Sequence, residues 1–195
     1  MIQHKVDQNT EEWMDLRKGK FTASSFKDLF MAKTTKGYQS AIYKVVYERM
    51  TGEQPENFTN DYMQRGHELE PLARECYEVE TFNEVQEPGF FELNEFVGAS
   101  PDGLVNDDGL LEIKCPAYNT MIAYLINPKL PTIYKYQVHG QMWVTGRKWC
   151  DFMCYHPKLK PVILRIERDE VIITDIIMKI EESIKEVESI INKIK

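Results

Sequence analysis

The first eighty residues carry apolar side chains three and four positions apart, which is the spacing typical of amphipathic helices. This pattern predicts helices over residues 10–18, 26–31, 38–50 and 60–80. The first of these opens on Thr10, a residue type favoured at N-caps, and has two acidic residues in its first turn. The N-terminal part of the chain is therefore expected to be mainly helical.

The pattern changes at residue 84, where short apolar stretches are separated by Pro, Gly, Asn and Asp. Strands are predicted over residues 84–93, 96–100, 103–106, 110–114, 149–155 and 162–167, with helices over 118–126 and 132–145. Asp108 and Gly109 form a pair typical of a tight hairpin turn. This order predicts an α/β (α+β) fold in which helices flank a central mixed sheet.

Helical spacing returns in the last part of the chain, from residue 173 onward. Its apolar positions are Ile173, Ile176, Ile177, Ile180, Ile184, Val187, Ile190, Ile191 and Ile194. This face can pack on the core of its own chain or form a seam between subunits. For a lone sequence we favour packing on the core.

The composition is that of a globular protein, with 195 residues, 43% of them hydrophobic and 28% charged. Glycine and proline are spread evenly and no repeat or linker is visible, so residues 1–195 are predicted to form a single domain. No apolar run approaches the roughly eighteen residues that cross a bilayer, and the N-terminus lacks the apolar segment of a signal peptide. We therefore expect a cytoplasmic protein with no membrane partner.

The charge is unevenly distributed along the chain, whose net charge is -7. Between residues 17 and 36 there are six basic residues and one acidic residue. The negative total argues against indiscriminate wrapping of DNA. The local basic surplus fits either a solvated helix flank or one anion-binding surface.

Candidate chemistry is concentrated in Ser100-Pro101-Asp102-Gly103 and Leu111-Glu112-Ile113-Lys114. If adjacent strands carry these segments, Asp102 and Glu112 can lie side by side, and alternation places Glu112 and Lys114 on one face. Carboxylate oxygens suit Mg²⁺, and a lysine can position or deprotonate a water for phosphodiester hydrolysis. This is the PD-(D/E)xK pattern of restriction-endonuclease-like nucleases. By itself the pattern is short, and a turn followed by a solvated strand face would produce the same letters.

Longer motifs make the nuclease interpretation more specific. They are Trp13-Met14-Asp15-Leu16-Arg17-Lys18-Gly19 with Thr22-Ala23-Ser24, Gly66-His67-Glu68-Leu69-Glu70, Leu111-Glu112-Ile113-Lys114-Cys115-Pro116, and Gln137-Val138-His139-Gly140-Gln141-Met142-Trp143-Val144-Thr145. In order and spacing the chain resembles bacteriophage lambda exonuclease and the related YqaJ-type viral recombinases. The resemblance extends from residue 13 to residue 145 and implies a restriction-endonuclease-like core.

The resemblance also implies a catalytic and metal site formed by Asp102, Glu112, the backbone carbonyl of Ile113, Glu70 and the catalytic lysine Lys114. Helical periodicity alone does not choose between Glu68 and Glu70, since both flank the apolar stripe of their helix. The resemblance selects Glu70. None of His67, His139 and His156 stands in a metal-binding motif.

A DNA-binding set follows from the same resemblance. Arg17, Ser24, Ser100 and Gln137 match positions that bind a phosphate at the 5′ end of the degraded strand. Met63 matches an apolar wedge that separates the terminal base pair. Lys33 and Lys36 lie in a stretch that differs from the family, and they are expected to contact the DNA backbone because of their charge. Each residue also has an ordinary structural explanation. Arg17 could be a surface residue, Ser24 a helix cap, Ser100 a turn residue and Gln137 a polar residue on an exposed helix face, and Met63 could pack in the core.

The function implied is a Mg²⁺-dependent 5′ to 3′ exonuclease on double-stranded DNA, with Mn²⁺ as a substitute metal. It would release 5′ mononucleotides and leave a 3′ single strand for phage-type recombination by single-strand annealing. The implied partners are DNA ends, two further subunits in a trimeric ring, and an annealing protein. The alternatives are an endonuclease or nickase of the same fold and an inactive DNA-binding module. An iron–sulfur nuclease would need a cysteine cluster that the four scattered cysteines do not supply.

Overall fold

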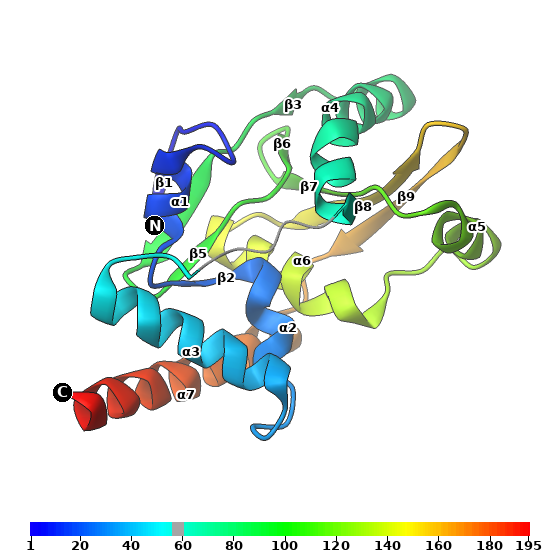
Figure 1. Ribbon diagram of the computed structural model, residues 1–195. Coiled ribbons are helices and arrows are strands. Elements are labelled where there is room, and N and C mark those ends of the chain that lie inside the picture. Colours follow the sequence, from blue (N-terminus) through cyan, green and yellow to red (C-terminus); the bar gives the residue numbers. More distant parts are fainter. Residues whose placement is uncertain (56–60) are drawn as a thin grey trace.

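The N-terminal part of the chain is mainly helical in a computed structural model that describes residues 1–55 and 61–195 (Figure 1). Its elements are β1 (Ile2–His4), α1 (Glu11–Arg17), β2 (Phe21–Thr22), the 3-10 turn η1 (Ala23–Ser25), α2 (Phe26–Leu29), α3 (Lys36–Thr51) and α4 (Asp61–Thr81). The Thr10 side chain caps α1 by accepting from the backbone N–H of Trp13 at 3.3 Å. Gly52, in the left-handed conformation, ends α3.

The strands form two sheets. The larger has the order β3-β6-β7-β8-β9 and consists of β3 (Val85–Gln86), β6 (Gly103–Val105), β7 (Gly109–Lys114), β8 (Trp149–His156) and β9 (Leu159–Glu167). In it only β7 and β8 are parallel, and they are connected through α5 (Tyr118–Ile126) and α6 (Thr132–Thr145). The smaller sheet has the order β1-β4-β5-β2 and includes β4 (Phe90–Asn94) and β5 (Val97–Ala99).

The mixed α/β fold is confirmed, including the hairpin at Gly109, where β6 and β7 pair antiparallel. The central mixed sheet is accompanied by a second, smaller one. The prediction of a continuous strand over residues 84–93 was wrong. That stretch breaks at Gly89, whose φ is +68° and whose added Cβ would meet the His4 carbonyl oxygen at 2.1 Å. Its halves therefore join different sheets. The strands β1 and β2 were not predicted, because two or three residues carry too little alternation to be recognised.

Strand β7 is buried on both faces, as expected for a strand paired in parallel inside a layered fold. Leu110 belongs to the hydrophobic cluster that includes residues of α6, whereas Leu111 and Ile113 belong to the cluster that includes residues of α4. The larger sheet therefore lies between α4 and α6, and β7 passes through the middle. Glu112 and Lys114 are in the C-terminal half of β7 and therefore lie between the α4 layer and the α6 layer.

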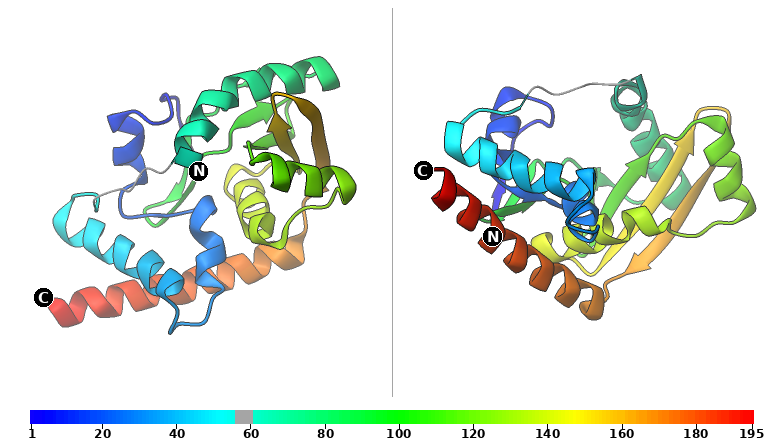
Figure 2. Two further views of the ribbon diagram at one scale, coloured as in Figure 1. Left: turned by 45° about the vertical axis from the view of Figure 1, so that its right-hand side comes forward. Right: turned by 60° about the horizontal axis from the view of Figure 1, so that its bottom comes forward.

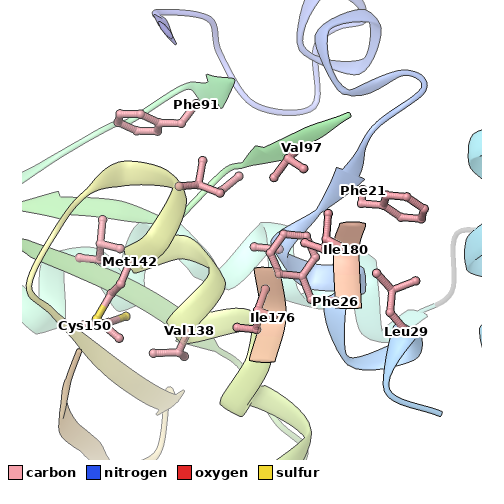
Figure 3. Packing of buried hydrophobic residues seen from close by; sticks show 14 of the residues in the cluster. Phe21, Phe26, Leu29, Phe91, Val97, Val138, Met142, Cys150, Ile176 and Ile180 are labelled. Carbon is pink, nitrogen blue, oxygen red and sulfur yellow. The ribbon is translucent and has the colours of Figure 1, made fainter. Parts of the chain in front are cut away.

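The larger cluster fixes the position of α6. Figure 3 shows Phe26, Val138 and Ile176 among its side chains. Gly140 lets α6 approach α2 closely, since a Cβ at this position would meet Phe26 Cδ2 at 2.4 Å. A larger residue at position 140 would push apart α2, which carries Phe26, and α6, which carries Gln137.

The final helix α7 (Glu170–Ile194) packs against α2, α3 and α6 (Figure 2). Its side chains Ile173, Ile176, Ile180 and Val187 are buried, so this face packs on the core of its own chain. Among the described residues, no helix combines the length and the apolar character that crossing a bilayer requires.

A polar contact anchors α4 to the larger sheet. The Tyr77 hydroxyl donates to Asp151 Oδ2 at 2.7 Å inside the second cluster. Arg165 donates to both oxygens of Asp151, at 2.5 and 3.0 Å, and its guanidinium stacks 3.4 Å from the centre of the Trp149 ring. Because Asp151 is only 3% exposed, these donors are what makes its burial tolerable.

Replacing Asp151 by alanine is expected to lower the free energy of unfolding by about 2–3 kcal/mol, because the Tyr77 hydroxyl loses its acceptor and Arg165 its counter-ion. The loss stays moderate because the Arg165 side chain is 46% exposed and remains hydrated. Tyr77→Phe keeps the ion pair and should lower the same free energy by about 1 kcal/mol. Chemical denaturation measures both values. Equal stability of the Asp151→Ala variant and the unaltered protein would show that the anchor is elsewhere.

Candidate active site

Asp102 and Glu112 meet at the end of the β6–β7 hairpin. The Asp102 N–H donates to the Leu111 carbonyl at 3.1 Å, and Asp102 Oδ2 accepts from the Ile113 N–H at 2.6 Å. These two bonds hold Asp102 beside the end of β7. The juxtaposition that strand alternation predicts is therefore present, including a Lys114 ammonium in contact with Glu112 Oε1.

The Glu112 carboxylate is only 1% exposed and is surrounded by donors. Besides Lys114, Gln137 Nε2 donates to its Oε1 and Gln141 Nε2 donates to its Oε2, both at 2.6 Å. The structure thus places Gln137 against Glu112, whereas its predicted contact with a 5′ phosphate stays a prediction. Sequence reasoning missed Gln141. Its signal was the spacing of four from Gln137, which places both amides on one helix face.

Helix α4 contributes Glu70 from the opposite side of β7. Arg74, one turn further along α4, donates from Nη2 to Glu70 Oε1 at 3.1 Å and to the Asp102 carbonyl at 3.2 Å. Glu68 instead accepts from Gln64 at 2.9 Å on the exposed side of the helix. Of the two glutamates, Glu70 faces the other acidic residues, and Arg74 is a second residue that sequence reasoning missed.

Glu70, Asp102 and Lys114 line a cavity of about 690 Å³. The other residues of its wall are Lys27, Gly66, His67, Ile113, Cys115, Pro116, Thr120, Tyr124 and Tyr134. Lys27 was counted only as part of the basic segment of residues 17–36, and its position in this wall depends on α2 packing against α6. The cavity therefore combines acidic groups with two lysines and an aromatic wall.

Burial and mutual repulsion perturb the titration of the acidic groups. Burial, with the charges of Glu112 and Glu70, raises the pKa of Asp102 well above its usual value. Burial also raises the pKa of Glu70, although Arg74 opposes this rise. For Lys114, burial alone would lower the pKa, but Glu112 and Asp102 outweigh it and raise the pKa above the usual lysine value. Lys114 therefore keeps its proton at neutral pH.

The donor set fits a hard divalent cation. Carboxylate oxygens of Asp102, Glu112 and Glu70 and the carbonyl of Ile113 are ligands of the kind that Mg²⁺ takes, completed by water and phosphate oxygens. Burial first, and then the negative charge of Glu112, raise the pKa of Asp102, and a cation would offset that charge. In the part of the chain that the structure describes, no group of three His, Cys, Asp or Glu side chains is placed so that it could hold a metal ion, so carbonyl, water and phosphate oxygens would have to supply the remaining ligands.

A second polar cluster adjoins the cavity residues through Ser100. Ser100 Oγ accepts from Trp13 Nε1 at 3.0 Å and from Arg17 Nη1 at 3.1 Å. Thr22 Oγ1 lies 3.5 Å from Arg17 Nη2 and 3.3 Å from the hydroxyl of Ser24. The structure thus brings together Arg17, Ser24 and Ser100, three of the four residues predicted to bind a 5′ phosphate.

Arg17 is held in place by its surroundings. Its guanidinium lies 4.0 Å from the centre of the Trp13 ring, and burial lowers its pKa to about 10, partly offset by Glu48. The loop after Arg17 is fixed by α3, because Glu48 Oε2 accepts from the Gly19 N–H at 2.8 Å. Arg17 is therefore a charged, preorganised donor. Trp13 belonged to the recognised motif, but sequence reasoning gave it no role.

The remaining predicted DNA contacts are Lys33, Lys36 and Met63. Lys33 forms ion pairs with Glu182 and Glu186 of α7, both at 2.8 Å, and these would have to open for it to bind DNA. Lys36 is exposed at the start of α3. The contacts of both lysines with DNA stay predictions. The Met63 side chain, predicted as a wedge, lies outside the described residues.

Comparison with known proteins places the chain in a family. Residues 12–148 match the family described as the YqaJ-like viral recombinase domain. The alkaline exonuclease LHK-Exo from Laribacter hongkongensis has a TM-score of 0.88 and 39% identity, over 95% of this chain and 96% of that one. The same enzyme in complex with dAMP gives a TM-score of 0.89 and 40% identity over the same shares.

A phage-related exonuclease from Haemophilus somnus 129PT has a TM-score of 0.69 and 19% identity over 93% of this chain and 100% of that one, a likeness of fold. No curated protein sequence matches the chain. The family match covers well over half of the residues and contains Arg17, Glu70, Asp102, Glu112 and Lys114. The chain belongs to the YqaJ-like viral recombinase family.

Proposed function

We propose that this protein is a Mg²⁺-dependent exonuclease that degrades double-stranded DNA from the 5′ end, releases 5′ mononucleotides and leaves a 3′ single strand. The observation that carries the proposal is that Glu70, Asp102 and Lys114 line one cavity, with the buried Glu112 carboxylate in contact with Lys114. Its relative LHK-Exo is an alkaline exonuclease, and the chains align over almost their whole lengths. The structure of that enzyme with dAMP supports a product of the mononucleotide class.

Asp102 and Glu112, with the Ile113 carbonyl and Glu70, are the residues that would hold Mg²⁺, and Mn²⁺ could replace it. When bound, such a cation supplies Lewis acidity at the scissile phosphate and stabilises charge on the departing oxygen. The two glutamines that bind Glu112 fix its carboxylate for this role.

Lys114 is proposed to position the attacking water or, once deprotonated, to take its proton. In the structure its ammonium contacts Glu112, from where it can donate a hydrogen bond to that water and stabilise charge developing on the phosphate. Attack in line with the departing 3′ oxygen then depends mainly on positioning and electrostatics. Loss of the ammonium should therefore affect turnover far more than DNA binding.

The cluster of Arg17, Ser24 and Ser100 is proposed to bind the 5′ phosphate, with Gln137 as a further donor. A guanidinium fork with hydroxyl donors suits the terminal phosphate, which carries more charge and more free oxygens than an internal one. Lys33 and Lys36 are proposed to contact the DNA backbone and Met63 to separate the terminal base pair.

The biological setting is proposed as well. A 3′ single strand is the substrate of a single-strand annealing protein, so such a protein is the proposed partner, in the cytoplasm of a bacterial cell and from a phage or prophage. A trimeric ring around the DNA would give processivity without strong affinity, which fits the net charge of -7.

The test of the function is digestion of a linear duplex labelled at one 5′ end, beside closed circular DNA. With Mg²⁺, we expect release of 5′ mononucleotides from phosphorylated linear ends and intact circles, and no cleavage in EDTA. Cut circles would support the endonuclease instead. Absence of cleavage with both Mg²⁺ and Mn²⁺ would support the alternative that the protein is an inactive DNA-binding module.

Lys114→Ala is expected to reduce the cleavage rate at least 100-fold, because the ammonium at the reacting phosphate is lost. Gel-shift measurements should show DNA binding within a few-fold of the unaltered protein. Lys158→Ala, which removes an exposed lysine from the β8–β9 turn, is the matched control and should keep full activity. If the folded Lys114→Ala protein cleaved DNA at the normal rate, the proposed catalytic role of Lys114 would be wrong.

Arg17→Ala should reduce the preference for 5′-phosphorylated over 5′-hydroxyl ends by about 10-fold or more, because hydrogen bonds to charged groups contribute about 1.5–3 kcal/mol. Arg17→Lys, which keeps the charge but not the fork, should show an intermediate preference. Lys18→Ala alters the neighbouring residue, which pairs with Asp15, and should leave the ratio unchanged. Rates on the two substrates give this ratio directly, and an unchanged ratio in Arg17→Ala would place the pocket elsewhere.

A further inference from the structure

Arg74 connects three separate segments of the chain behind the acidic residues. Its side chain is 18% exposed. Nη2 donates to Glu70 Oε1 on the same helix and to the backbone carbonyl of Asp102, whereas Nη1 pairs with Glu87 between β3 and β4. A single guanidinium therefore joins α4 to the loop that carries Asp102.

We propose that Arg74 is a positioning residue that holds Glu70 and Asp102 in the arrangement needed to bind the divalent cation. The inference rests on the proposed function, since it concerns the same site. Arg74 lies behind the ligands and contacts them through a side-chain oxygen of one and a main-chain oxygen of the other. The proposed role of Arg74 does not involve contact with DNA.

The contacts explain why such a residue is needed. Glu70 lies on α4 and Asp102 lies just before β6, two segments far apart in the chain. Arg74 donates to both, at 3.1 and 3.2 Å, so a single side chain sets how close they lie. Its positive charge also offsets the negative charge of Glu70, with which it forms an ion pair.

Geometry explains why the residue is an arginine. The planar fork offers donors in fixed directions, so one nitrogen can serve two acceptors while the other reaches Glu87. A lysine in this place would supply the charge as a single point and would not hold all three groups. Partners of this kind behind metal ligands typically change metal affinity by 10- to 100-fold.

The contact with Glu87 provides an internal control. The Glu87 side chain is 69% exposed, so its pair with Arg74 contributes little to stability. Glu87→Gln removes this outer charge and leaves both contacts to Glu70 and Asp102 in place. A purely structural role of Arg74 would lower the melting temperature without changing the affinity for Mg²⁺.

The experiment measures Mg²⁺ binding by isothermal titration calorimetry, with no DNA present, for the unaltered protein, Arg74→Lys, Arg74→Gln and Glu87→Gln. We expect the Kd for Mg²⁺ to rise about 10- to 100-fold in both Arg74 variants and to stay unchanged in Glu87→Gln. The Mg²⁺ concentration for half-maximal cleavage should rise by the same factor, with maximal kcat reduced less. Melting curves select the variants that are folded at the assay temperature.

An unchanged Kd in folded Arg74→Lys and Arg74→Gln would overturn the positioning role and leave the exonuclease proposal standing. An equal rise of the Kd for Mg²⁺ in Glu87→Gln would also overturn the positioning role of Arg74, because any change of charge in this region would then have the same effect. If the unaltered protein binds Mg²⁺ but does not cleave DNA, the proposed function fails, while calorimetry on the variants still decides the role of Arg74.

Discussion

Glu112 places a carboxylate at 1% exposure in a region that also contains Asp102 and Glu70, and the rest of the site is arranged around this concentration of negative charge. A buried, unpaired charge would destabilise the fold by several kcal/mol or take up a proton. Donors reach the Glu112 carboxylate from β7 and from α6, and a guanidinium reaches Glu70 from within α4. The acidic residues thus require a support on each side of the sheet.

The two supports have different origins. Helix α6 is fixed by apolar packing, with Gly140 against Phe26 bringing it close to α2. Helix α4 packs on the second apolar cluster through Ala73 and Tyr77 and has in addition a polar anchor, in which the Tyr77 hydroxyl donates to Asp151 of β8. Since β7 runs between them, the positions of the acidic groups depend on both layers. Weakening either contact should disturb the site even though neither contact touches it.

The sequence was sufficient to predict which residues form the acidic site, but not the long-range contacts that hold them in place. Alternation along β7 predicted that Glu112 and Lys114 share a face, because a period of two is a property of one strand. The Gly89 break, the two short strands β1 and β2, and the contact of Arg74 with Asp102 depend on segments far apart in the chain. No local pattern encodes such contacts. Gln137 illustrates the limit, since its motif identified it and only the fold placed it against Glu112.

The segment from Ser100 to Asp102 connects the two polar clusters. Ser100 contacts Arg17, whereas Asp102 contacts Ile113 at the end of β7. Two residues of extended chain span at most about 7 Å, so the proposed phosphate pocket and the acidic site are held a short, nearly fixed distance apart. Gln8 supports this segment from outside by donating to the Pro101 carbonyl at 2.9 Å. A terminal phosphate bound by Arg17 would then place the next phosphodiester of the same strand near Asp102. If the pocket binds the terminal phosphate as proposed, this spacing would favour removal of one nucleotide at a time from an end.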